Sequence, residues 1–468
     1  MLPSTVLELV KGMVEVDGEK ITAVVENKLL SSQWDEVVVM AVFGSEVEKS
    51  ACRWLIWEVG QCVGVRPASI NDLYMARGRK EVPLDFTVPA MNLRGMGYDM
   101  ARSVFKAAKN LKVGALICEL ARSEMGYTDQ SPVEYVAVVL AGAIREGWRG
   151  GLCVQADHFQ AKALEPGKPK EGEIEAIKEL TEESIKAGFY NIDIDMSTLV
   201  DLDKKSEKEQ QFGNIKYSLE LAKSIREVEP EGVTVSIGGE IGHIGGKNST
   251  IEDFEAYIKG FNQGLGNLTG MSKISVATGT HHGGVVLADG SLADISVDFK
   301  VLGDISKACR SLKISGAVQH GASTLPDQFF KEFVKAEAIE VHLATGFQNI
   351  MMDHKSFPKE LLEKMYRWLD EKKVDERKED QTDEQFHYKL RKKAWGEFKK
   401  ECWDIDEKAR EEIREDLEKR FEFLFKELNV INTEGLAKKW IKAVEIHKTV
   451  KDFTVKQDQV EEVRGLSD

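Results

Sequence analysis

The sequence predicts a (β/α)8 TIM barrel that carries an N-terminal extension and a helical C-terminal extension. Eight short apolar runs follow one another through the middle of the chain, and each except the last is followed by a helical pattern. The apolar runs are continuous rather than alternating, which is typical of parallel strands that are buried on both faces. Four of the runs end in segments with residues able to bind a metal, as expected at the carboxyl ends of barrel strands.

The expected elements follow in chain order. Strands are predicted at residues 86–92, 113–120, 151–156, 189–195, 233–238, 273–277, 314–318 and 339–343. Helices are predicted at residues 99–110, 132–146, 171–187, 207–228, from about 251, 299–312 and 327–336. Ser249 or Thr250 is expected to cap the helix that begins near residue 251, because a hydroxyl there can accept from the first backbone N–H groups.

The chain of 468 residues is longer than a minimal barrel of about 250 residues, so further segments are expected. We divide it into an accessory region (1–82), a catalytic barrel (83–354) and a charged helical region (355–468). In the accessory region, residues 34–43 are predicted as a strand and residues 47–63 as a buried helix, which cap the barrel or contact another subunit. The C-terminal stretches 359–371, 383–402 and 406–428 are predicted as amphipathic helices that pack on the barrel or on another subunit. They favour a homo-oligomer.

Composition narrows the classes of partner. The net charge of −15 argues against nucleic acid as the main ligand. No apolar run approaches the roughly 20 residues that a membrane-spanning helix needs, and the N-terminus shows no signal-peptide pattern. The six cysteines form no CxxC pair, which favours reduced thiols in a cytoplasmic protein.

Four segments that end apolar runs carry candidate metal ligands. They supply His158, Glu240, His282 and His320, and the segments recur at the spacing of one or two βα units, each of roughly 30 residues or more. Imidazoles combined with a carboxylate suit zinc or another transition metal better than magnesium or calcium. We therefore predict one metal site shared by these residues.

Three further candidates are aspartates: Asp157 directly follows the predicted strand 151–156, and Asp193 and Asp195 lie on the predicted strand 189–195. Asp157 precedes His158, and because adjacent residues on a strand point to opposite sides, both are not expected to bind one ion. A general acid/base role is predicted for Asp157, with capping of the following helix as the alternative. Asp193 and Asp195 face one side of their strand, and Asp195 is predicted to orient a metal-bound histidine. The alternative is ordinary pairing with interior polar groups.

Glycine-rich runs after the strands predict an anion site. Residues 242–246, 283–284 and 321–324 can present backbone N–H groups to a phosphate or a carboxylate. The candidate substrate-binding residues are Asn92, Gly283, Gly321, Ala322 and Ser323.

Taken together, these segments resemble the class II, metal-dependent ketose-bisphosphate aldolases of the fructose- and tagatose-bisphosphate types. The resemblance runs from about Phe86 to Phe347 and rests on the Asp-His pair 157–158, the Ile-Asp-x-Ser element 194–197, and the Glu-x-Gly-x-x-Gly-Gly element 240–246. The Gly-Thr-x-His-Gly element 279–283 and the His-Gly-x-Ser element 320–323 complete it.

The resemblance implies that His158, His282 and His320 bind zinc and that Glu240 is an alternating ligand that takes part in catalysis. It implies that Asp157 transfers the proton of the substrate C4 hydroxyl while the metal stabilises the enediolate left by C3–C4 cleavage. Gly283, Gly321 and Ser323 would line the site of the substrate phosphate and of an associated monovalent cation.

Two segments depart from the family pattern. Lys247 and Asn248 follow the double glycine where the family has an acidic proton shuttle, and residues 342–349 replace an Asn-x-Asp element on the last strand. The sequence therefore predicts a zinc-dependent aldolase that reversibly cleaves a ketose phosphate or bisphosphate. A metal-dependent ketose or ketose-phosphate 4-epimerase is the alternative. A third hypothesis is a non-catalytic aldolase companion subunit, against which the retained histidines and Glu240 argue.

Overall fold

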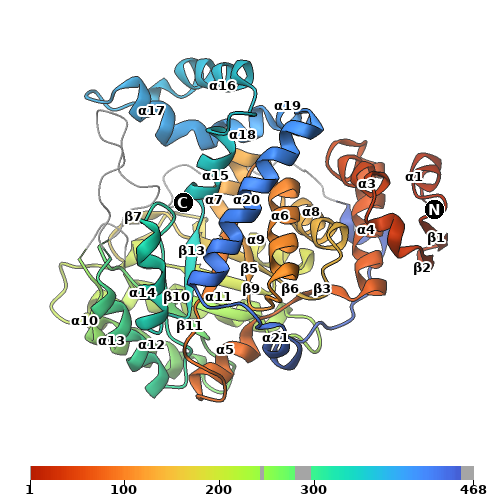
Figure 1. The fold of residues 1–468 in the computed structure, drawn as a ribbon. Helices are drawn as coiled ribbons and strands as arrows, with labels where there is room; N and C mark the ends of the chain where they lie inside the picture. Colours follow the sequence, from red (N-terminus) through yellow and green to blue (C-terminus); the bar gives the residue numbers. More distant parts are fainter. Residues whose placement is uncertain (1, 243–246, 280–296, 455–468) are drawn as a thin grey trace.

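The computed structural model describes residues 2–242, 247–279 and 297–454, and a closed barrel of eight parallel strands lies at its centre (Figure 1). Its strands are β4 (Val88–Asn92), β5 (Ile117–Ala121), β6 (Gly150–Gln160), β9 (Asn191–Asp195), β10 (Ser236–Glu240), β11 (Lys273–Ser275), β12 (Ala317–Gln319) and β13 (Glu340–Leu343). Pairing of β13 with β4 and of β6 with β9 closes the ring, which confirms the predicted fold class. A ninth strand, β3 (Val65–Ala68), extends the amino end of β6 from outside.

Helices surround the barrel because the outward face of its strands is apolar and must be covered. They are α6 (Gly97–Asn110), α7 (Arg122–Thr128), α8 (Pro132–Arg145), α9 (Glu173–Ala187), α10 (Glu207–Gln210), α11 (Phe212–Val228), α12 (Ile251–Leu265), α13 (Phe299–Ser311), α14 (Phe330–Lys335) and α15 (Thr345–Met352). Thr250 is the residue that caps α12: its hydroxyl accepts from the backbone N–H of Asp253 at 3.1 Å. Between β6 and α9 lies a small hairpin of β7 (Ala163–Glu165) and β8 (Lys168–Pro169).

The prediction of a strand at residues 34–43 is wrong. Residues Ser32–Phe43 form the helix α3, whose buried face consists of Trp34, Val37, Val38, Ala41 and Val42. The valine run suggested a strand, but burial at every third or fourth position against α4 (Glu46–Val63) and α8 makes a helix the better solution. The predicted buried helix at residues 47–63 is confirmed as α4. None of the described helices combines the length and the apolar character needed to span a membrane.

The helix α5 (Asn71–Gly78) closes the amino end of the barrel. Arg77 is fully buried there and donates to the carbonyl oxygens of Phe86, Leu84 and Glu337, which lie just before β4 and β13. A guanidinium has five donors, so one side chain can satisfy several strand-entry carbonyls that burial would otherwise leave without partners. Part of the accessory region therefore caps the bottom of the barrel.

The eighth position in the ring of helices belongs to α20 (Glu407–Glu427), which packs against α6, α14 and α15 (Figure 1). Its apolar face contributes Leu417 and Phe421, and the Phe421 ring lies 4.7 Å from the Phe347 ring of α15. The residues between α15 and α20 form α16 (Lys359–Lys372), α17 (Asp383–Leu390), α18 (Ala394–Glu397) and α19 (Lys399–Trp403). Of these, α18 packs on α7, beside the carboxyl ends of the strands.

Truncation of Leu417 to alanine should destabilise the whole barrel by about 2–5 kcal/mol, the usual cost of emptying a buried leucine site. Glu415→Ala is the matched control on the exposed face of the same helix. Urea unfolding followed by circular dichroism measures the difference. Equal stability of the two variants would show that α20 is not part of the barrel core.

Candidate functional site

A bulge near the end of β6 brings Asp157 and His158 to the same side of the strand. The pairing of β6 with β9 shifts register between Ala156 and Phe159, and His158 has a positive φ of 42°. An extra residue at this point rotates the side chains that flank it, and strand bulges often serve sites in this way. The expectation that adjacent residues point apart is therefore wrong here, because the strand is not regular at these two positions.

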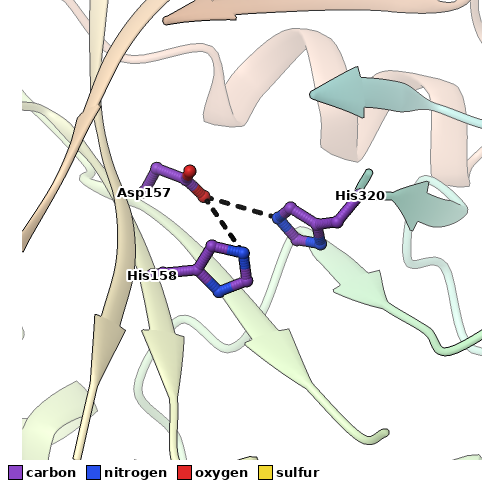
Figure 2. A group of neighbouring side chains, drawn as sticks. All are labelled: Asp157, His158 and His320. Carbon is purple, nitrogen blue, oxygen red and sulfur yellow. Dashed lines mark ion pairs between the residues drawn. The ribbon is translucent and has the colours of Figure 1, made fainter. Parts of the chain in front are cut away.

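Asp157 and His158 converge with His320, which follows β12 (Figure 2). The Oδ1 atom of Asp157 lies 3.4 Å from Nε2 of His320 and 3.9 Å from Nε2 of His158. The two imidazole rings have centroids 4.1 Å apart, and all three side chains are buried. One ligand atom from each residue lies within 4.8 Å of the other two.

Asp195, at the end of β9, holds the far nitrogen of His158. Its Oδ2 atom lies 2.9 Å from His158 Nδ1 and accepts from Gln160 Nε2 at 2.6 Å. Its Oδ1 atom accepts from the backbone N–H and the hydroxyl of Ser197, at 3.0 and 2.6 Å. With every carboxylate oxygen engaged, Asp195 fixes the His158 ring so that Nε2 faces Asp157 and His320.

Glu240 ends β10 beside the same cluster. Its Oε2 atom lies 3.5 Å from Nδ1 of His320, and that nitrogen is also 2.6 Å from the Ser275 hydroxyl. The two glycines before it lie in crowded places on the two faces of the strand, Gly238 toward the barrel interior and Gly239 toward the surrounding helices. A Cβ on Gly238 would meet Asp193 Oδ1 at 2.2 Å, and one on Gly239 would meet Met271 Sδ at 2.5 Å.

The remaining predicted residues are placed as follows. His282 and Gly283 lie outside the described residues. The amide of Asn92 donates to Glu124 of α7, and the hydroxyl of Ser323 accepts from the backbone N–H of Ala344 at 2.5 Å. Gly321 has a φ of 70° and lies next to His320, followed by buried Ala322. The Asn92 amide nitrogen and the Ser323 hydroxyl are thus engaged with protein partners, whereas the buried Oδ1 atom of Asn92 has no partner among the described residues.

Burial and mutual charge set the protonation of the cluster. Burial opposes a charge on Asp157, but His158 and His342 outweigh it and hold the pKa of Asp157 well below its usual range. Burial also disfavours a charged His158, yet Asp157 and Asp195 raise the pKa of His158 to about 10. Burial and then the charge of Asp195 raise the pKa of Glu240 to about 8. Burial and the neighbouring imidazoles hold the pKa of His320 well below its usual range.

The donor set fits a transition metal. Zinc binds imidazole nitrogen and carboxylate oxygen at about 2.0–2.2 Å in a tetrahedral arrangement, which puts ligand atoms a little over 3 Å apart. The separations of 3.4 and 3.9 Å around Asp157 Oδ1 are close to that geometry. His158 and His320 would hold such an ion; Asp157 lies beside Nε2 of both rings, whereas Glu240 lies beside Nδ1 of His320.

Sequence reasoning missed a buried charged network directly beneath this cluster. Lys273 Nζ donates to Gln155 Oε1 (2.7 Å), Asp193 Oδ2 (2.9 Å) and Glu340 Oε1 (2.5 Å). His342 sits above it, against both Asp157 and Glu340. The signal that could have found these residues is a polar pair two positions apart on a short apolar strand, since both members then face the barrel interior. Asp193 belongs to this network. This agrees with the alternative hypothesis, in which it pairs with interior polar groups.

A cavity of about 500 Å³ adjoins the rim of the site. Lys162 and Lys170 from the hairpin after β6 and Lys247 after β10 contribute to its lining, together with the hydroxyl residues Ser197 and Ser249. Lys247 is also 3.7 Å from Asp253, so its charge is partly balanced. Three lysines against one aspartate give this cavity a positive lining in a chain of net charge −15. Such a lining favours an anionic ligand.

A parallel (β/α)8 barrel with imidazoles and carboxylates gathered at the carboxyl ends of its strands defines a class of metal-dependent barrel enzymes. Within that class, the chain belongs to the family described as fructose-bisphosphate aldolase class-II, whose model matches residues 83–424. The match confirms the resemblance drawn from the sequence and extends through most of α20. No curated protein matches this sequence.

Several solved structures are similar in fold. A fructuronate–tagaturonate epimerase from Cohnella laeviribosi has a TM-score of 0.51 at 10% identity and covers 74% of this chain and 82% of its own. A probable tagatose 6-phosphate kinase from Sinorhizobium meliloti has a TM-score of 0.50 at 13% identity, over 80% and 99%. A fructose-bisphosphate aldolase from Campylobacter jejuni has a TM-score of 0.46 at 17% identity, over 79% and 97%. At these identities the likeness concerns the fold alone.

Asp195→Asn should weaken the metal affinity by about 10- to 100-fold, the usual effect of removing the carboxylate that orients a metal-binding histidine. Competition with a chromogenic zinc chelator measures the affinity directly and needs no substrate. Asp203→Asn, an exposed aspartate in the loop after β9, is the matched control. Unchanged affinity in Asp195→Asn would contradict the role of this carboxylate in orienting a metal-binding His158.

Zinc affinity should rise with pH between about 6.5 and 8.5, because protons on His158 and Glu240 must leave before the metal binds. The sign follows from pKa values of about 10 for His158 and about 8 for Glu240, both above their usual values, so both groups hold protons at neutral pH. Calorimetry in two buffers with different heats of ionisation counts the protons released. A pH-independent affinity would contradict the described electrostatics.

Proposed function

We propose that the protein is a zinc-dependent lyase of the aldolase type that breaks the C3–C4 bond of an anionic ketose by a reversible retro-aldol reaction. The observation that carries the proposal is the convergence of Asp157, His158 and His320 at one mouth of the barrel, with Asp195 orienting His158. When bound, zinc would draw electron density from the ketose carbonyl and so favour the negative charge left by bond cleavage. A monovalent cation beside the substrate anion is part of the proposal.

Asp157 is the proposed proton-transfer residue. Its carboxylate is buried among His158, His320 and His342, and its lowered pKa keeps it deprotonated. A deprotonated carboxylate can accept the proton of the C4 hydroxyl as the C3–C4 bond breaks, and return it in the reverse direction. Glu240, with its raised pKa, is proposed to exchange a proton or to bind the metal in alternation with substrate.

The positively lined cavity supports an anionic substrate. Lys162, Lys170 and Lys247 lie in segments that follow β6 and β10, the strands that also supply His158 and Glu240. A phosphate or carboxylate at one end of the sugar would be attracted to this rim while the ketose carbonyl lies near the histidines. Cytoplasmic location and self-association are proposed with this function.

A second candidate is a 4-epimerase, which would break and re-form the same bond without releasing the fragments. The altered last strand fits this reaction as well as it fits simple cleavage. Residues 342–349 replace the family's Asn-x-Asp element for the substrate phosphate, and the Ser323 hydroxyl accepts from the backbone N–H of Ala344. The fold-related fructuronate–tagaturonate epimerase suggests that a carboxylate-bearing ketose belongs in the substrate panel.

One assay separates these functions. Purified zinc-loaded protein is incubated with ketose bisphosphates, ketose monophosphates and keto-uronates, and both aldehyde release and 4-epimer formation are scored by chromatography. Aldehyde release supports the lyase, and epimer formation without release supports the epimerase. Failure to turn over any of these substrates in the presence of zinc would overturn both.

Asp157→Asn should lower kcat on the accepted substrate by about 10²–10⁴-fold, because the amide cannot accept the hydroxyl proton. The variant is nearly isosteric, so it should retain zinc, which atomic absorption checks. Asp203→Asn again serves as the control. Near-normal turnover of Asp157→Asn would remove this residue from the mechanism.

A further inference from the structure

The carboxylate of Asp157 is approached from the last barrel strand by His342. Nδ1 of His342 lies 3.1 Å from Asp157 Oδ1 and 3.0 Å from Glu119 Oε2, and its ring centroid is 4.0 Å from that of His320. All of these side chains are buried. One ring nitrogen therefore faces two carboxylates that would otherwise face each other inside the barrel.

The other ring nitrogen of His342 also contacts a carboxylate. This Nε2 atom lies 2.6 Å from Glu340 Oε1, two residues earlier on the same strand. Glu340 in turn accepts from Lys273 Nζ and Gln155 Nε2, and its other oxygen accepts from the hydroxyl of Tyr74 at 2.5 Å. A continuous series of polar contacts thus runs from α5, at the bottom of the barrel, to Asp157 at the mouth.

We propose that His342 is a positioning residue: it holds the Asp157 carboxylate in the single orientation that proton transfer requires, and Glu340, Lys273 and Tyr74 hold His342. This inference rests on the proposed role of Asp157. An ionised carboxylate beside substrate has free rotation about its side-chain bonds unless a donor fixes it, and misplacement of a reacting group by about 1 Å can cost 10²-fold in rate. His342 supplies such a contact from the last barrel strand, as an ion pair at 3.1 Å.

The two ring nitrogens of His342 allow a matched pair of substitutions. The side-chain amide of asparagine reaches the place of Nδ1, so His342→Asn keeps a donor for Asp157 and loses the contact with Glu340. Glutamine reaches the place of Nε2, so His342→Gln keeps the contact with Glu340 and loses the donor for Asp157. The variants are therefore similar in polarity and opposite in which contact they keep.

The experiment compares kcat, KM and zinc content of both variants, and determines their crystal structures. We expect His342→Gln to lose about 10²-fold in kcat with KM and zinc content unchanged, and His342→Asn to recover most of that loss. In the crystals, the Asp157 carboxylate should keep its place in His342→Asn and turn or become multiple in His342→Gln.

Three results would overturn the proposal: equal losses in both variants, no loss in either, or an unmoved Asp157 carboxylate in His342→Gln. If wild-type protein turns over none of the tested ketoses, the proposed function fails, while the crystal structures still decide whether His342 positions Asp157. Should His342→Gln fail to fold, Glu340→Gln tests the same series of contacts one step further away. It should displace Asp157 in the crystal, and an unmoved carboxylate there would count against the proposal.

Discussion

Burial of charge inside the barrel is the constraint on which the rest of the structure depends. Carboxylates of Glu119, Asp157, Asp193 and Glu340 lie within the ring of strands, where unpaired charges are strongly disfavoured. Lys273 reaches across the barrel to two of them, and His342 contacts all four. Burial lowers the pKa of Lys273, but the charges of Asp193 and Glu340 outweigh burial and raise it above its usual value. Because removing one member of such a group leaves its partner uncompensated, these residues act as one unit.

The bulge in β6 shows how a local irregularity becomes a chemical site. A regular strand offers one inward side chain for every two residues, so Asp157 and His158 would have been separated by the strand itself. With the register shift and the positive φ at His158, both reach the interior, and Asp195 on the neighbouring strand fixes the imidazole. The proposed base and the proposed metal ligand become adjacent without any change in the fold.

Much of this could be predicted from the sequence, and the failures have physical reasons. Eight buried strands and most helices follow from apolar runs and spacing, and the strand-end positions of His158, Glu240 and His320 follow from them. The bulge could not be predicted, because no residue type marks it. The segment that forms α3 was predicted as a strand because a run of valines favours one. Its packing against α4 and α8, which makes it a helix, cannot be read from the valines alone. Lys273 and Glu340 were overlooked because each charge is compensated by residues distant in sequence, which only the closed barrel brings together.

The position of α20 has a consequence for how the protein is made. The helix that completes the ring beside α6 begins at Glu407, more than sixty residues after β13 ends at Leu343. During synthesis, all eight strands therefore leave the ribosome while the apolar faces of α6, α14 and α15 are still uncovered. Domains emerging from the N-terminus fold first, and incompletely covered apolar surface is prone to aggregate. The ring of helices around the nascent barrel stays incomplete until α20 has been made, so these apolar faces stay exposed for longer than in a barrel whose last covering helix directly follows its eighth strand.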